Sequence, residues 1–155
     1  MDEAIQIATD RNNFVLLGAS YLWLGIMATE KGEHSRASEF YSQALSYSTN
    51  LRETAKADLI SRVTAYQAKN ELAQRNYCKA YSYYQASIKA THILEDYKNL
   101  EYGEVYKGLS ICCLKQGQLK DSKRYSIIAA HYLEKATVEG IKSNCLFSFI
   151  PKNCS

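Results

Sequence analysis

The residues of this chain best suited to chemistry are three histidines and five cysteines. His34, His92 and His131 lie far apart, and none has the spacing that would pair it with a nucleophile and a carboxylate, as hydrolytic sites require. The cysteines are odd in number and contain no C-x-x-C pair, which is typical of neither a disulfide framework nor a zinc site. A glycine-rich phosphate loop is also missing from the sequence. We therefore predict no enzyme activity, no metal site and no cofactor.

Charge is distributed unevenly along the sequence. Residues 1–50 carry three basic and six acidic groups, whereas residues 51–155 carry sixteen and ten, for a total of +3. Lys120, Lys123 and Arg124 form a basic cluster at helical spacing that could contact phosphate. The total charge is nevertheless modest for a nucleic-acid-binding domain. We interpret the cluster as solvated surface and expect no nucleic-acid partner.

The composition indicates one globular domain built from helices. Hydrophobic residues make up 46% of the 155 residues and charged residues 23%, and the longest apolar stretches fall far short of the roughly 20 residues that a membrane span requires. A single proline and seven glycines are too few for the frequent turns of a β-sandwich. The acidic N-terminus lacks the pattern of a secretory signal, so we expect a reducing, cytoplasmic setting in which the cysteines are thiols.

An internal repeat organises the sequence. Segments of the same pattern lie at 30–37, 73–80 and 115–122. Gly32, Arg75 and Gly117 occupy the same place in these segments, 43 and 42 residues apart. Each segment follows one apolar stretch of helical periodicity and precedes another, so the predicted unit is a helix, a tight turn and a helix.

The first unit, between residues 18 and 45, resembles the tetratricopeptide repeat. The matching positions are Tyr21, Leu24, Gly25, Ala28, Gly32, Ala37, Tyr41 and Ala44. The third unit is a degenerate copy, and the first helix of the second unit fits only with a one-residue shift. A period near 42 exceeds the common 34 residues, as in the long-period arrays of kinesin light chains and Rap-type peptide receptors.

This resemblance implies an all-α fold, an α-α superhelix of about eight antiparallel helices. We expect helices near 2–9, 13–31, 34–48, 52–73, 76–95, 98–116, 118–134 and 136–147. They form units near 13–48, 52–95 and 98–134 with a half-repeat at each end. One repeat domain would cover residues 1–147, followed by a tail at 148–155.

The resemblance also implies a binding groove, because the first helix of each pair lines the concave face in this family. The carried-over positions are Leu22, Ile26, Thr29, Arg62, Lys69, Lys107 and Ile111. Their mixture of apolar and cationic side chains suits a protein or peptide with apolar anchors and acidic groups. Leu22 and Ile26 stand where chaperone-binding members have the residues that clamp a terminal carboxylate, so that subtype is not expected.

The ends of the sequence keep two further functions open. Neither end shows a strong polar cap of the kind that solenoids need, and the apolar segment 145–150 favours burial against another surface. The chain is therefore also interpreted as a self-assembly module, a homo-oligomer or part of a longer array. The repeat length alone suggests a third function, the peptide-sensing part of a bacterial regulator without its output domain.

Overall fold

The chain folds into helices, as the sequence predicts. The computed structural model describes residues 5–6, 13–92, 94 and 99–147, and this part of the chain contains no β-strand. Its elements are α2 (Phe14–Glu30), α3 (His34–Ser46), the 3-10 helix η1 (Tyr47–Asn50), α4 (Glu53–Ala73), α5 (Tyr77–Thr91), α6 (Asn99–Lys115) and α7 (Leu119–Phe147). Among the described residues, no helix combines the length and apolar character needed to cross a membrane.

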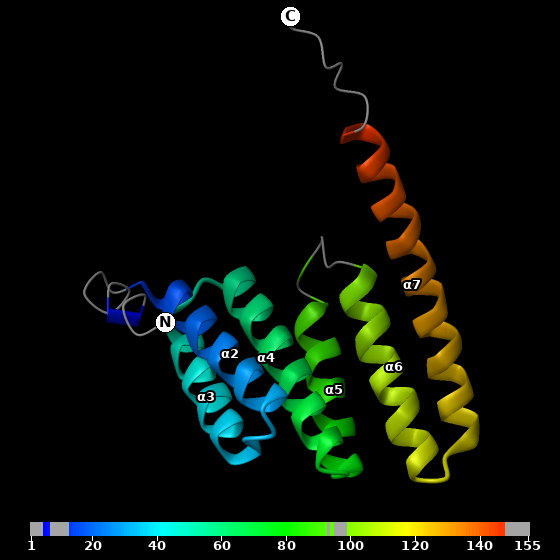
Figure 1. Ribbon diagram of the computed structural model, residues 1–155, viewed down its shortest axis with the longest axis horizontal. Coiled ribbons are helices and arrows are strands. Elements are labelled where there is room, and N and C mark those ends of the chain that lie inside the picture. Colours follow the sequence, from blue (N-terminus) through cyan, green and yellow to red (C-terminus); the bar gives the residue numbers. More distant parts are fainter. Residues whose placement is uncertain (1–4, 7–12, 93, 95–98, 148–155) are drawn as a thin grey trace, which may run out of the picture.

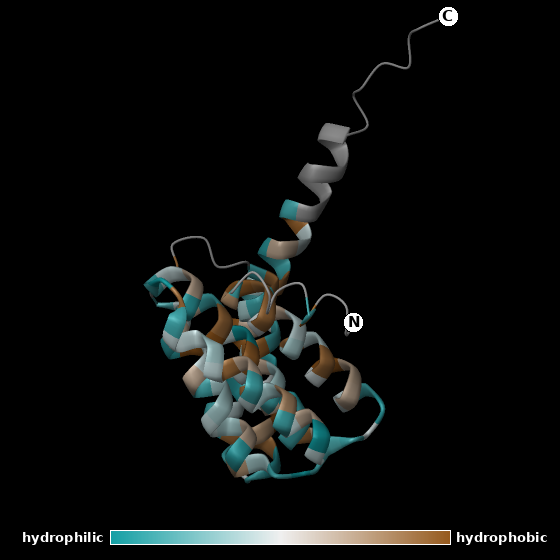
Figure 2. Ribbon diagram, turned by 90° about the vertical axis from the view of Figure 1, so that its left-hand side faces the viewer, coloured by the Kyte–Doolittle hydropathy of each residue, from teal (hydrophilic) through white to brown (hydrophobic). Residues whose placement is uncertain are grey.

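The helices are arranged as three pairs in a row, α2 with α3, α4 with α5, and α6 with α7 (Figure 1). Within each pair the two helices pack along their length. The second helix of one pair packs on the first helix of the next, α3 on α4 and α5 on α6. The far end of α7 extends beyond the other helices (Figures 1 and 2).

The three predicted turns are confirmed and share one geometry. Gly32, Arg75 and Gly117 have positive φ angles of 75°, 63° and 76°. The same hydrogen bond closes each turn with an N···O distance of 2.9 Å, from Glu33 to Ala28, from Asn76 to Glu71 and from Gln118 to Cys113. This is the Schellman arrangement, which favours glycine at the left-handed position. The one-residue shift expected for the second unit is wrong, because its turn is in register with the other two.

Aromatic packing also repeats, but only in the outer pairs. The triplets are Tyr21, Phe40 and Tyr47 in the first pair and Tyr106, Tyr125 and Tyr132 in the third. In each triplet the ring of the first-helix tyrosine lies between 5.8 and 6.4 Å from the two other rings. Thr64 replaces that tyrosine in the middle pair, and its hydroxyl donates to the carbonyl of Ile60 at 2.7 Å. The second unit therefore departs from the pattern in residue type and not in backbone register.

Small residues allow large ones to be buried between helices. Gly25 of α2 lies against the buried ring of Tyr41, and Gly108 of α6 lies against the buried ring of Tyr84. A methyl group added at either glycine would overlap the tyrosine ring, so the close helix approach depends on the missing side chain. These contacts belong to two apolar clusters, one centred on α2–α4 and the other on α4–α6.

A polar contact joins the first pair to the second. Asn70 of α4 is buried, and its Nδ2 donates to the carbonyl of His34 at 3.2 Å and to Ser38 Oγ at 3.3 Å. Its Oδ1 lies 2.7 Å from His34 Nδ1. Because a buried amide is costly unless it is paired, this network fixes the placement of α4 on α3.

The predicted C-terminal helices need correction. We expected helices at 118–134 and 136–147, but α7 runs without interruption from Leu119 to Phe147. The residues around the expected break, Leu133–Thr137, include neither glycine nor proline and several good helix formers, so nothing there stops the helix. Of the helix expected at 2–9, only residues 5–6 are described, and both are helical. The tail at 148–155 lies outside the described residues.

Candidate functional site

A groove between α4 and α6 is the best candidate site in the described part of the chain. Both are first helices of their pairs, and α5 packs against both of them. The cavity between them has a volume of about 410 Å³. It is lined by Arg62, Ala65, Tyr66, Lys69, Leu100, Glu101, Glu104 and Val105.

The two walls of this groove carry opposite charges. Arg62 and Lys69 stand on α4, whereas Glu101 and Glu104 stand on α6. Arg62 is 3.7 Å from Asp58 on its own helix, and the ammonium of Lys69 lies 5.0 Å above the ring of Tyr66.

On the opposite wall, Glu104 is 3.7 Å from Lys107. Exposed pairs one helical turn apart contribute little to stability, so a partner could exchange its own charges for them at small cost. The apolar surface between the charged walls comes from Ala65, Leu100 and Val105. The groove therefore combines two cations, two carboxylates and an apolar floor.

Four of the predicted groove residues lie on or beside this groove. Arg62 and Lys69 line it. Lys107 is exposed and reaches the groove only through its partner Glu104. Ile111 is half-buried one turn further along α6 and is not among the lining residues.

Two predicted residues are wrong as groove contacts. Leu22 has 0% and Ile26 has 8% of its surface exposed, and both belong to the apolar cluster that also contains Leu59 and Val63 of α4. Their side chains pack between α2 and α4, where a ligand cannot reach them. The physical reason is Gly18, whose missing side chain lets Leu59 approach α2 closely.

Thr29 is also occupied by an internal contact. Its hydroxyl donates to the carbonyl of Gly25 at 3.0 Å and lies 2.8 Å from the hydroxyl of Tyr41. Because Thr29 has a single hydroxyl proton, Tyr41 is the donor in the second bond. Burial raises the pKa of Tyr41 to about 12, so this donor keeps its proton at neutral pH.

Leu100, Glu101 and Tyr66 are lining residues that the sequence prediction missed. The carried-over positions in α6 begin at Lys107, nearly two turns later, so Leu100 and Glu101 lay before the predicted set. One signal was available. Glu101 is 42 residues after Leu59, which shows that an apolar residue at this place in α4 becomes a carboxylate in α6.

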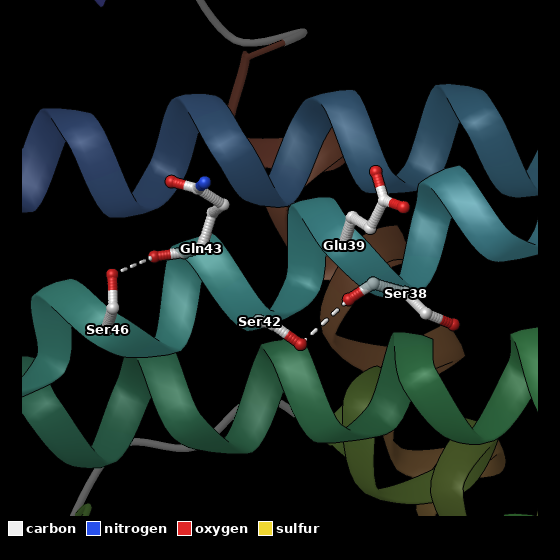
Figure 3. A pocket seen from close by; sticks show the side chains of 5 residues that line it. All are labelled: Ser38, Glu39, Ser42, Gln43 and Ser46. Carbon is white, nitrogen blue, oxygen red and sulfur yellow. Dashed lines mark hydrogen bonds between the residues drawn. The ribbon is translucent and has the colours of Figure 1, made fainter.

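A second hollow, on α3, is a weaker candidate. Figure 3 shows its lining of Ser38, Glu39, Ser42, Gln43 and Ser46, all from one helix. The hydroxyl of Ser42 donates to the carbonyl of Ser38 at 2.9 Å, and that of Ser46 donates to the carbonyl of Gln43 at 2.7 Å. These donors are already used within the helix, so the hollow offers a partner little beyond a solvated surface.

The thiols of the described residues are not arranged for chemistry. Cys78, Cys112 and Cys113 are free. Burial raises the pKa of Cys112 to about 11 and also raises the pKa of Cys113, which keeps both in the poorly nucleophilic thiol form. Among the described residues, no group of three or more His, Cys, Asp or Glu side chains could hold a metal ion.

Comparison with known proteins places no name on this site. No protein-family model, no curated protein and no solved structure matches the chain.

Proposed function

We propose that this chain is a tetratricopeptide-like α-solenoid that binds a segment of another polypeptide in the groove between α4 and α6. The observation that carries the proposal is the groove itself, in which Arg62 and Lys69 face Glu101 and Glu104 across an apolar floor. An open groove between two first helices suits an extended or helical segment better than a small molecule, which favours an enclosed pocket. Free cysteines agree with a reducing, cytoplasmic setting for this activity.

The chemistry of the groove defines the partner. An apolar anchor would contact Leu100 and Ala65, and an acidic side chain would pair with Arg62 or Lys69. A basic group in the same segment would find Glu101 or Glu104. The preferred ligand is therefore a peptide with an apolar residue next to an acidic one, and an added base on the side of α6 would strengthen binding. The proposal includes no catalytic step.

A random peptide library displayed on phage provides the test. Peptides selected on the full chain should be enriched in the apolar-acidic pattern, and Lys69→Glu and Arg62→Glu should each weaken their binding by about tenfold, equivalent to about 1.4 kcal/mol. Lys79→Glu is the matched control, because Lys79 is an exposed lysine of α5 outside the groove. Equal losses in the groove variants and in the control would rule out the groove as the binding site.

A further inference from the structure

The joint between neighbouring pairs occurs twice inside the chain. In both joints the second helix of one pair packs on the first helix of the next, α3 on α4 and α5 on α6. His34 and Asn70 meet in the first joint, with 2.7 Å between Nδ1 and Oδ1. Tyr84 and Gly108 meet in the second. A further joint of this kind would need one exposed face of a first helix and one exposed face of a second helix.

The helix α2 presents an exposed first-helix face. Trp23 and Met27 lie 43 residues before Tyr66 and Asn70, the α4 residues that pack toward the first pair. The exposed fractions of Trp23 and Met27 are 52% and 43%. An apolar surface of α2 is therefore exposed at the position equivalent to the one where α3 packs on α4.

The helix α7 presents the matching second-helix face. Leu119 and Ser126 lie 42 residues after Tyr77 and Tyr84, on the side of α5 that packs on α6. Leu119 is 66% exposed and the neighbouring Ile127 is 62% exposed. Ser126 is exposed as well, so no described residue covers the side of α7 on which a following helix would pack.

The two exposed faces complement each other position by position. Leu119 is the repeat equivalent of His34, and Met27 is the repeat equivalent of Asn70. In a joint between α7 and α2, this apolar pair would therefore replace the polar pair of the first joint. Where the large Tyr84 fits the small Gly108 in the second joint, the small Ser126 would face the large Trp23. The sizes are reversed but still match, which is the requirement for close packing.

Charge favours the same arrangement. In the described part of the chain, residues 13–50 carry two basic and three acidic groups, a net charge of −1, and residues 119–139 of α7 carry four basic and three acidic groups, a net charge of +1. The α7 face includes Lys123 beside Ile127. An acidic end meeting a basic end attracts, whereas two identical ends repel.

We propose that copies of this chain associate head to tail, with the α2 face (Trp23 and Met27) of one copy packed on the α7 face (Leu119, Ser126 and Ile127) of the next. The contact is heterologous, so one free α2 face remains at one end of the assembly and one free α7 face at the other. The assembly therefore grows with concentration and does not stop at a symmetric dimer. The groove between α4 and α6 is separate from both faces and stays open in every copy.

Fluorescence provides the first test, because Trp23 is the only tryptophan of the chain. Emission of the wild-type chain should shift to shorter wavelength as concentration rises from about micromolar to about millimolar, since the indole ring becomes buried. Ile127→Asp changes the opposite end of the molecule and should abolish this shift. A shift that persists in Ile127→Asp would overturn the head-to-tail contact.

Mixing two variants provides the second test. Met27→Asp disables the α2 face and Ile127→Asp disables the α7 face, so each variant should sediment as a monomer. Their equimolar mixture should form a one-to-one heterodimer and nothing larger, because one intact face of each kind remains. Circular dichroism is the check that both variants remain folded.

Val15→Asp is the matched control. Val15 is an exposed residue of α2 whose equivalent in α4 is the exposed Asp58, outside the joint, so this variant should assemble like the wild type. A wild-type chain that is monomeric at all concentrations, a mixture that stays monomeric, or Ile127→Asp that still dimerises would each overturn the proposal. The last result would indicate a symmetric contact between two α2 faces.

Discussion

The two places where successive first helices face each other differ sharply. Between α2 and α4, Leu22 and Ile26 pack against Leu59 and Val63, and the space is closed. Between α4 and α6, the equivalent residues Ala65, Lys69 and Glu101 are only half-buried, and a cavity of about 410 Å³ remains. We call the first contact the closed seam and the second the open groove.

The difference comes from the residue on the opposing helix. Leu59 of α4 packs into the space beside Gly18 of α2. In the next repeat, Glu101 of α6 is equivalent to Leu59, and Ser61 of α4 is equivalent to Gly18. A carboxylate keeps its hydration and stays at the surface, whereas leucine gains free energy by burial. The seam and the groove thus differ by an apolar-to-acidic replacement on one wall, together with the change from Leu22 and Ile26 to Ala65 and Lys69 on the other.

Equivalent positions on the two sides should show the largest contrast in stability. Leu22→Ala removes a fully buried side chain from the closed seam and should lower the free energy of unfolding by about 3 kcal/mol. Lys107→Ala changes the equivalent position 85 residues later, where the side chain is exposed, and should alter it by less than about 0.5 kcal/mol. Urea unfolding followed by circular dichroism measures both. Similar losses in the two variants would show that α6 is as tightly packed at Lys107 as α2 is at Leu22.

This contrast shows how far the sequence could predict the structure. Helix order and the three turns followed from periodicity and from the glycines, which act locally, whereas Arg62 and Lys69 were carried over from the family resemblance. The burial of Leu22 did not follow, because it depends on Leu59, 37 residues later, and on how closely α4 approaches α2. Local patterns place a side chain on a helix face. They do not show what the opposite helix holds.

The equivalence of Leu59 and Glu101 requires that α4 be in register with α2 and α6. A substitution at Arg75, in the turn after α4, tests this register. Arg75 has a φ of 63° at the position where the outer turns have glycine. A left-handed conformation costs a residue with a side chain about 1 kcal/mol, so Arg75→Gly should raise the free energy of unfolding by about that amount. Gly117→Arg, the reverse change in the third turn, should lower it by a similar amount. Urea midpoints at constant slope measure both effects.

If Arg75→Gly were destabilising, the backbone equivalence of the three turns would be contradicted, and with it the pairing of Leu59 with Glu101. Thermal unfolding at two scan rates excludes a purely kinetic effect, because only an equilibrium change gives the same midpoint at both rates. The variant touches neither the seam nor the groove. Its result therefore bears on the register alone.

Of the proposed variants, Glu101→Leu should change stability least, and it tests most directly whether the groove must be open for binding. Glu101→Leu gives α6 the residue that α4 has at Leu59, so the side chain should turn toward Ser61 and fill part of the groove. The apolar burial gained is offset by the lost carboxylate in the first turn of α6, where the helix dipole favours an acid, so the free energy of unfolding should change by less than about 0.5 kcal/mol. Binding of a peptide selected on the wild-type chain should nevertheless fall by about tenfold.

Glu101→Gln separates shape from charge in this experiment. The amide is close in size to the carboxylate and remains hydrated, so the groove should stay open. If the peptide binds the Glu101→Gln variant as tightly as the wild type but binds the Glu101→Leu variant weakly, closure of the groove is the cause of the lost affinity. If both variants bind the peptide equally weakly, the carboxylate itself contacts a basic group of the peptide. Unchanged binding in both would show that the residue at this place does not decide between seam and groove.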